Sequence, residues 1–156
     1  MKLNYFIIPL IVLSFSLLGS AFTSDGIDSG WYDSIIKPSW TPPGSVIGMI
    51  WTTIFILTAI AALIVWNTFP RSKNFRSIIQ LFLMNGAVNV LWSVLFFGSH
   101  AIGAAVIVAM VIEVTVIALI VCLWPVSPRA ALLLFPYAGW VFFAIYLNSI
   151  IFSLNR

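Results

Sequence analysis

Three polar side chains and one indole follow one another at helical spacing in the apolar stretch at residues 77–99. Asn85, Asn89, Trp92 and Ser93 are separated by four, three and one residues, so a helix presents them on one face. Amides facing lipid would lack hydrogen-bond partners, which is unfavourable. We therefore expect this face to point into the protein, where it could either join helices by hydrogen bonds or line a cavity.

A single carboxylate lies near the middle of residues 101–123, which contain no other charge. It belongs to Glu113. A charge at the centre of a membrane helix costs about 2.5 to 3.5 kcal/mol on insertion scales, so such acids are first interpreted as functional. We expect Glu113 to be protonated or hydrogen-bonded to Asn85, Asn89 or Asn148. No basic residue lies within any apolar stretch, which argues against an ion pair or a proton relay.

A stripe of four residues recurs at every fourth position near the C-terminus. It consists of Pro136, Trp140, Ala144 and Asn148. On a helix these residues share a face, and the small alanine leaves space between a large ring and an amide. The stripe could be ordinary helix packing or the wall of a binding site. Trp51 would complete an aromatic wall if it faced this stripe.

The segment at residues 31–43 combines aromatic rings with three prolines. Tyr32 and the two tryptophans in this segment are amphipathic rings suited to a membrane–water interface. The prolines favour an extended chain, so we expect no helix before Gly44. Two interpretations stay open, an interfacial anchor and a lid over a cavity.

The elements that must position these residues are helices in lipid. Of the 156 residues 62% are hydrophobic and 7% are charged, against about 25% charged in soluble domains. A soluble fold of this size could not bury so much apolar surface, whereas a helix satisfies its own backbone hydrogen bonds in a bilayer. We predict an all-α fold, a single-domain polytopic membrane protein with a five-transmembrane-helix bundle.

Five stretches are long enough to span the hydrocarbon core, which takes about 20 residues. The predicted spans are residues 3–22, 44–66, 77–99, 101–123 and 130–153, and residues 23–43 form the pocket-covering loop. The first stretch could instead be a secretory signal peptide, because Lys2 precedes it and Gly19 and Ala21 near its end are small. Four helices would then remain.

Small residues recur at four-residue spacing in two of these stretches. Gly44 and Gly48 begin the second, and Ala101, Ala105 and Ala109 begin the fourth. Small residues let membrane helices approach closely. They could mark contacts within the bundle or a dimer face.

Basic residues predict the orientation. One side of the membrane would hold Lys2, Arg71, Lys73, Arg76 and Arg129, and the other only Lys37 and Arg156. Loops rich in Lys and Arg stay in the cytoplasm. We therefore predict a cytoplasmic N-terminus, with the first loop and the C-terminus outside, and we interpret the net charge of +3 as topology rather than nucleic-acid binding.

Residue sets typical of conventional enzymes are missing from the sequence. The single cysteine, Cys122, excludes an intramolecular disulfide and a cysteine-based metal cluster, and the single histidine, His100, cannot by itself form a metal site. There is no P-loop and no Ser-His-Asp arrangement. We predict no cofactor and no metal. An apolar pocket with aromatic walls and few polar groups suits a flat hydrophobic molecule.

Several motifs together resemble the TspO/MBR (translocator protein) family, in its bacterial form. The resemblance covers the chain from the first to the fifth helix, and the order and spacing of its parts make it specific. These parts are Trp31-Tyr32, Lys37-Pro38-Ser39-Trp40-Thr41-Pro42-Pro43, Gly48 with Trp51, Asn89-Val90-Leu91-Trp92-Ser93, Phe96-Phe97-Gly98, Pro128-Arg129-Ala130-Ala131, Pro136-Tyr137, Trp140, Phe143-Ala144 and Leu147-Asn148.

Two departures from the family pattern accompany this resemblance. Many relatives carry Gln at the position of Asn85, so the reach of the amide differs here. The tail at residues 147–156 contains no Tyr, so it does not reproduce the cholesterol-recognition pattern of many mitochondrial relatives.

The resemblance implies a homodimer of five-helix bundles, each with a cavity that opens toward the first loop. It implies an integral protein of the bacterial cell membrane that binds protoporphyrin IX or a related tetrapyrrole, and synthetic benzodiazepine-type or isoquinoline ligands. The ligand-binding candidates are Tyr32, Trp51, Asn85, Asn89, Trp92, Glu113, Trp140, Ala144 and Asn148.

Some bacterial family members are reported to promote light- and oxygen-dependent degradation of the bound porphyrin. For that activity Trp51 and Trp140 are the catalytic candidates. Two other functions stay open: a transporter of porphyrin or another lipophilic substrate, and a stress-sensing regulatory membrane protein. Glu113 favours transport, and the lack of inverted repeats and broken helices opposes it.

Overall fold

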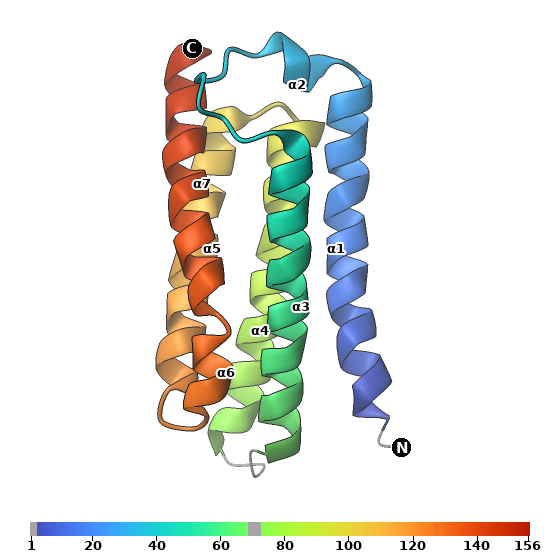
Figure 1. Cartoon of the computed structure of the whole chain (residues 1–156), viewed down its shortest axis with the longest axis vertical. Helices are drawn as coiled ribbons and strands as arrows, with labels where there is room; N and C mark the ends of the chain where they lie inside the picture. The colour runs from blue at the N-terminus through green and yellow to red at the C-terminus, as the bar shows by residue number, and fades with distance from the viewer. Residues whose placement is uncertain (1–2, 69–72) are drawn as a thin grey trace.

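The computed structural model describes residues 3–68 and 73–156, and these residues form helices joined by short connections (Figure 1). The elements are α1 (Asn4–Asp28), α2 (Trp31–Ser34), α3 (Gly44–Thr68), α4 (Lys73–Ser93), the π-helical turn η1 (Val94–Gly98), α5 (Ile102–Leu123), α6 (Pro128–Leu132) and α7 (Phe135–Leu154). Five helical stretches are long and apolar enough to cross a membrane. The predicted all-α bundle of five membrane helices is therefore confirmed.

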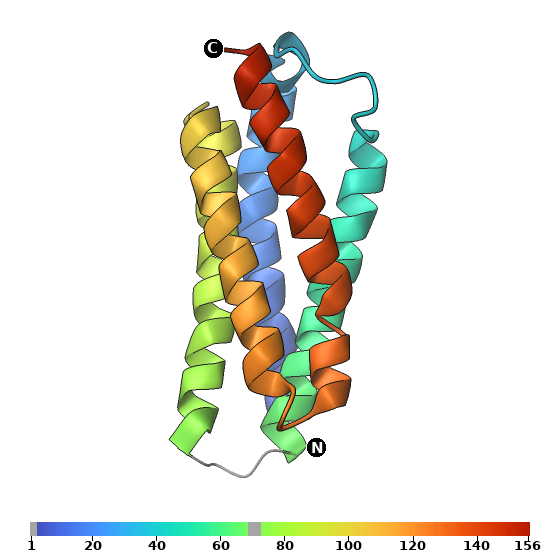
Figure 2. The ribbon, with the colours of Figure 1, turned by 90° about the vertical axis from the view of Figure 1, so that its left-hand side faces the viewer.

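The long helices run side by side along the molecule (Figures 1 and 2). The start of α1, the end of α3, the start of α4 and α6 lie at one end of the bundle, whereas α2, η1 and the end of α7 lie at the other (Figure 1). Helix α1 packs against both α3 and α4, and α5 packs against α4 and α7. Helix α3 meets the C-terminal helices mainly through α6. Helices α3 and α7 therefore make few direct contacts with each other.

The first membrane helix is longer than predicted. Helix α1 continues to Asp28, so the first part of the predicted covering loop 23–43 is helical. The polar side chains after residue 22 do not interrupt the helix. Thr23 Oγ1 donates to the Gly19 carbonyl of its own helix at 3.1 Å, and the backbone keeps the helical pattern as far as Ser29, whose N–H bonds the Asp25 carbonyl at 3.0 Å. The expectation of no helix before Gly44 was also wrong. The prolines do not prevent α2, because this short helix ends at Ser34, before the first of them.

The fifth predicted span, residues 130–153, consists of two helices rather than one. Pro136 lies at the start of α7, where it supplies no N–H and its ring crowds the preceding turn. The chain therefore makes a tight turn in which the Leu134 N–H bonds the Ala131 carbonyl at 3.0 Å. Helix α6 begins with Pro128 after Ser127, whose side chain accepts from the Ala130 N–H, a favourable helix start.

Two glycines allow α1 to pack closely on its neighbours. A Cβ atom on Gly26 would lie 2.9 Å from the Cβ of Phe97 in η1. A Cβ atom on Gly86 in α4 would lie 2.6 Å from the ring of Phe15. Both separations are shorter than side chains tolerate, so these positions require glycine for α1 to sit where it does.

Candidate functional site

A cavity of about 380 Å³ lies in the half of the bundle nearest α2. Its volume falls within the range of about 300 to 1,000 Å³ that is usual for small-molecule sites. All five long helices contribute to its walls, and α2 covers it. The space between α3 and α7 is therefore a site-sized chamber.

Most of the predicted ligand-binding residues meet in this chamber. It is lined by Tyr32, Trp51, Asn89, Trp92, Trp140, Ala144 and Asn148. Asn85 instead lines a second cavity in the other half of the bundle. Glu113 lines neither of these two cavities.

The position of Glu113 follows from helix geometry. Its neighbour Ile112 lines the chamber, and one residue along a helix rotates the side chain by about 100°. The expected hydrogen bonds to Asn85, Asn89 or Asn148 do not form, and Glu113 Oε2 is buried without a hydrogen-bond partner among the described residues. Of the two alternatives for Glu113, the hydrogen bond to one of these amides was therefore wrong, and a protonated side chain stays a prediction.

Tryptophans from three helices line the chamber. Trp51 of α3 contacts Tyr137 of α7 edge to face, with 6.1 Å between ring centroids. Trp92 of α4 stacks on Phe96 with its centroid 5.2 Å away and an angle of 13° between the rings. Trp140 of α7 completes the set. Trp51 therefore borders the same chamber as Trp140, Ala144 and Asn148 of the α7 stripe, which is the condition for an aromatic wall.

A chain of hydrogen bonds joins α4, α5 and α7 beside the chamber. Asn89 Nδ2 donates to the Tyr137 hydroxyl and, at 2.9 Å, to the Asn85 carbonyl. The Tyr137 hydroxyl donates to Asn85 Oδ1 at 2.9 Å. Asn85 Nδ2 donates to Thr115 Oγ1 at 2.8 Å, and Thr115 donates to the Ile112 carbonyl at 2.8 Å. Both interpretations of the amide face therefore apply, since Asn85 joins helices and Asn89 also lines the chamber.

Two residues that line the chamber carry buried N–H groups that the protein leaves unused. Trp140 Nε1 and Asn148 Nδ2 are buried and have no hydrogen-bond partner in the described part of the chain. They lie eight residues apart on α7, which is about 12 Å along a helix. Because unpaired buried N–H groups are unfavourable, a guest with acceptors at these two points would be stabilised.

The segment over the chamber is fastened to the end of α7. Asn155 Nδ2 donates to the Ile36 carbonyl at 2.9 Å, and the Ile36 N–H donates to Asn155 Oδ1 at 2.9 Å. The Lys37 ammonium donates to the Tyr32 carbonyl and lies 4.3 Å from the centre of the Tyr32 ring. These contacts hold the segment across the top of the bundle, in the position of a lid.

Helix α2 is also held by aromatic stacking. The Trp31 ring lies parallel to the His100 ring, with 4.2 Å between centroids and 9° between planes. Burial, with a smaller contribution from the Asp33 carboxylate, raises the pKa of the Tyr32 phenol. The phenol that faces the chamber therefore keeps its proton at neutral pH and can donate it to a guest.

The sequence interpretation missed the contribution of α1. Ser16, Ser20 and Thr23 line the chamber, and their spacing of four and three residues in an apolar stretch was the available signal. The small residues of α3 were expected to mark contacts within the bundle or a dimer face. Gly44 and Gly48 border the chamber, and a Cβ atom at either position would meet no atom within 4 Å. They therefore widen the chamber rather than seat a neighbouring helix of the bundle, and a dimer face at these positions stays a prediction.

Comparisons with known proteins give one consistent result. The TspO/MBR family matches residues 6–153. A Tryptophan-rich protein TspO from Archaeoglobus fulgidus is 36% identical over 147 residues, which cover 94% of this chain and 93% of that protein. The protein of the same description from Bacillus cereus is 38% identical over 130 residues, covering 83% of each. The human Translocator protein is 32% identical over 141 residues, covering 89% of this chain and 82% of that protein.

Proposed function

Because the chain belongs to the TspO/MBR family, we propose that it is a membrane receptor for protoporphyrin IX or a related tetrapyrrole. Family membership and five apolar helices make it an integral membrane protein of the receptor or transporter type. The ligand class rests on one observation, a chamber lined by Trp51, Trp92 and Trp140 in which two N–H donors have no protein partner.

The chemistry of the chamber suits a large, flat, conjugated guest. Indole rings pack on other aromatic systems by offset stacking or edge-to-face contact and bury much apolar area. Trp140 Nε1 and Asn148 Nδ2 would donate to acceptors at two separated points of the guest. A small aliphatic molecule would leave one or both donors unpaired. The tetrapyrrole class fits this combination of stacking area and peripheral acceptors.

We also propose that the bound porphyrin is degraded in light and oxygen. The porphyrin absorbs the light, oxygen is the oxidant, and Trp51 or Trp140 donates an electron or forms an adduct. Transport has no comparable support, because Glu113, the residue that favoured it, lies outside both cavities. Three further properties stay predictions: a homodimer, binding of benzodiazepine-type or isoquinoline ligands, and a stress-sensing role.

We expect purified, detergent-solubilised protein to bind protoporphyrin IX saturably in the dark. Quenching of tryptophan fluorescence and the Soret absorption band would follow the titration. Asn148→Leu removes one unpaired donor and should weaken binding about three- to tenfold, the usual net value of one hydrogen bond. The matched control is Ser149→Ala, since Ser149 does not line the chamber and donates to its own helix at 2.8 Å. Unsaturable binding would refute the tetrapyrrole assignment.

We propose that the end of the bundle with the start of α1 faces the cytoplasm. Arg76 and Arg129 belong to that end, whereas Lys37 and Arg156 belong to the other, and Lys and Arg are enriched on the cytoplasmic side. In a Cys122→Ser background, a membrane-impermeant maleimide should label Ser39→Cys in intact cells. It should label Asn74→Cys only after lysis, and the reverse pattern would contradict this orientation.

A further inference from the structure

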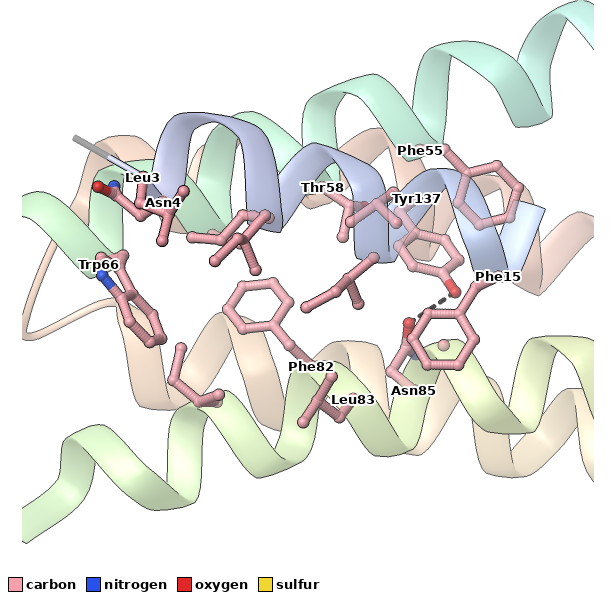
Figure 3. A pocket seen from close by; sticks show the side chains of 17 residues that line it. Leu3, Asn4, Phe15, Phe55, Thr58, Trp66, Phe82, Leu83, Asn85 and Tyr137 are labelled. Carbon is pink, nitrogen blue, oxygen red and sulfur yellow. Dashed lines mark hydrogen bonds between the residues drawn. The ribbon is translucent and has the colours of Figure 1, made fainter. Parts of the chain in front are cut away.

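A second cavity, of about 500 Å³, occupies the other half of the bundle. It lies between α1, α3 and α4, with Tyr137 of α7 at its inner end (Figure 3). Phe15 and Phe55 line this cavity and the tryptophan-lined chamber. The two spaces are therefore neighbours that share these two rings.

The second cavity is long and almost entirely apolar. Its lining begins at Leu3, directly before α1, and continues along α1 to Phe15, which is about 18 Å along a helix. On α3 it is bordered by Ala62 and Trp66, and on α4 by Phe82. None of the three tryptophans of the chamber lines it. This shape suits an extended chain rather than a stacked ring system.

The inner end of this cavity holds unused hydrogen-bond donors. Thr58 is 8% exposed, and its Oγ1 has no hydrogen-bond partner among the described residues. On the same helix Thr52 and Thr53 each donate to the carbonyl four residues earlier, at 2.9 Å. Asn85 uses one amide hydrogen on Thr115 and has a second to donate. Figure 3 places Thr58, Asn85 and Tyr137 together at this end, away from Leu3 and Trp66.

The depth of these donors limits what can approach them. Thr58 is the fifteenth of the 25 residues of α3, so it lies near mid-membrane. A charged head group there is strongly unfavourable. A neutral oxygen carried on a hydrocarbon chain avoids this cost and suits the apolar walls beyond this end.

We propose that the second cavity binds a linear, neutral lipophile with an oxygen acceptor at one end, of the long-chain alcohol class. The chain lies along the apolar walls between α1, α3 and α4. The oxygen accepts from Thr58 Oγ1 and from the second N–H of Asn85. Leu3 and Trp66 at the opposite end of the cavity are exposed, so the molecule enters at this open end, where α1 begins.

Native mass spectrometry of the full-length, detergent-solubilised protein tests this assignment with three probes: hexadecan-1-ol, hexadecane and hexadecanoate. We expect the parent protein to bind one hexadecan-1-ol per chain. The Thr58→Val variant should bind the alcohol about fivefold more weakly, because valine keeps the branched shape of threonine but loses one hydrogen bond. Hexadecane should bind both proteins equally. The matched control is Thr53→Val, since Thr53 lines neither cavity, and it should bind the alcohol as the parent protein does. Melting temperatures of all three proteins would show that each is folded.

Three results would overturn the proposal. Equal affinity of the parent protein for the alcohol and the alkane would mean that the cavity takes only a hydrocarbon tail, such as that of a phospholipid. An equal loss of alcohol binding in Thr53→Val and Thr58→Val would show that Thr58 has no specific role. Tighter binding of hexadecanoate than of the alcohol would show that the head group is charged and lies at the open end.

Discussion

Replacing Tyr137 with phenylalanine will lower the free energy of unfolding by about 2 kcal/mol, the range observed when buried partners lose a hydrogen bond. The Tyr137 side chain is 2% exposed, and its hydroxyl accepts from Asn89 and donates to Asn85 Oδ1. Removing the oxygen leaves both amides with an unpaired group inside the bundle. Reversible unfolding in mixed micelles, followed by circular dichroism, measures the change.

Tyr146 provides the matched control on the same helix. It is 59% exposed, and its ring stacks on Trp40 with 5.7 Å between centroids. No hydrogen bond of its hydroxyl occurs within residues 3–68 and 73–156, so Tyr146→Phe should change the free energy of unfolding by less than about 0.5 kcal/mol. Similar losses in the two variants would contradict a structural role for the chain of hydrogen bonds.

Replacing Trp51 with phenylalanine will slow photodegradation of bound protoporphyrin IX about tenfold, which corresponds to about 1.4 kcal/mol in activation free energy. This expectation rests on the proposed function. Trp51 lines the chamber, and phenylalanine keeps a ring there but is a much poorer electron donor than indole. Affinity in the dark should change less than the rate. Illumination of the saturated complex in air, with loss of the Soret band, gives the rate.

The control for this substitution is Trp124→Phe. Trp124 is 49% exposed, contacts Phe135 and lines neither cavity. The Trp124→Phe substitution should leave the rate of photodegradation unchanged. Identical rates for the Trp51→Phe and parent proteins under the same lamp would refute the role of Trp51, even if the dark titration showed that the porphyrin binds.

The five membrane helices could be predicted because their signals are local. A stretch of about 20 apolar residues must be helical in lipid whatever lies beside it. For the same reason, spacing along one helix was enough to predict that four residues share a face: Asn85, Asn89, Trp92 and Ser93. Prolines and short polar residues are weaker signals, because their effect depends on the turn that forms. For that reason the end of α1, the turn α2 and the break between α6 and α7 differed from the prediction.

Only the tertiary structure decided which cavity each side chain meets. Asn85 and Asn89 share a helix face, yet one lines the second cavity and the other the chamber. Glu113 follows a chamber residue directly and still lies outside both. Helical periodicity sets the angles between side chains on one helix, but it does not set the rotation or the depth of the next helix. Those depend on close contacts between helices, such as Phe15 against Gly86, and no local pattern in the sequence encodes them.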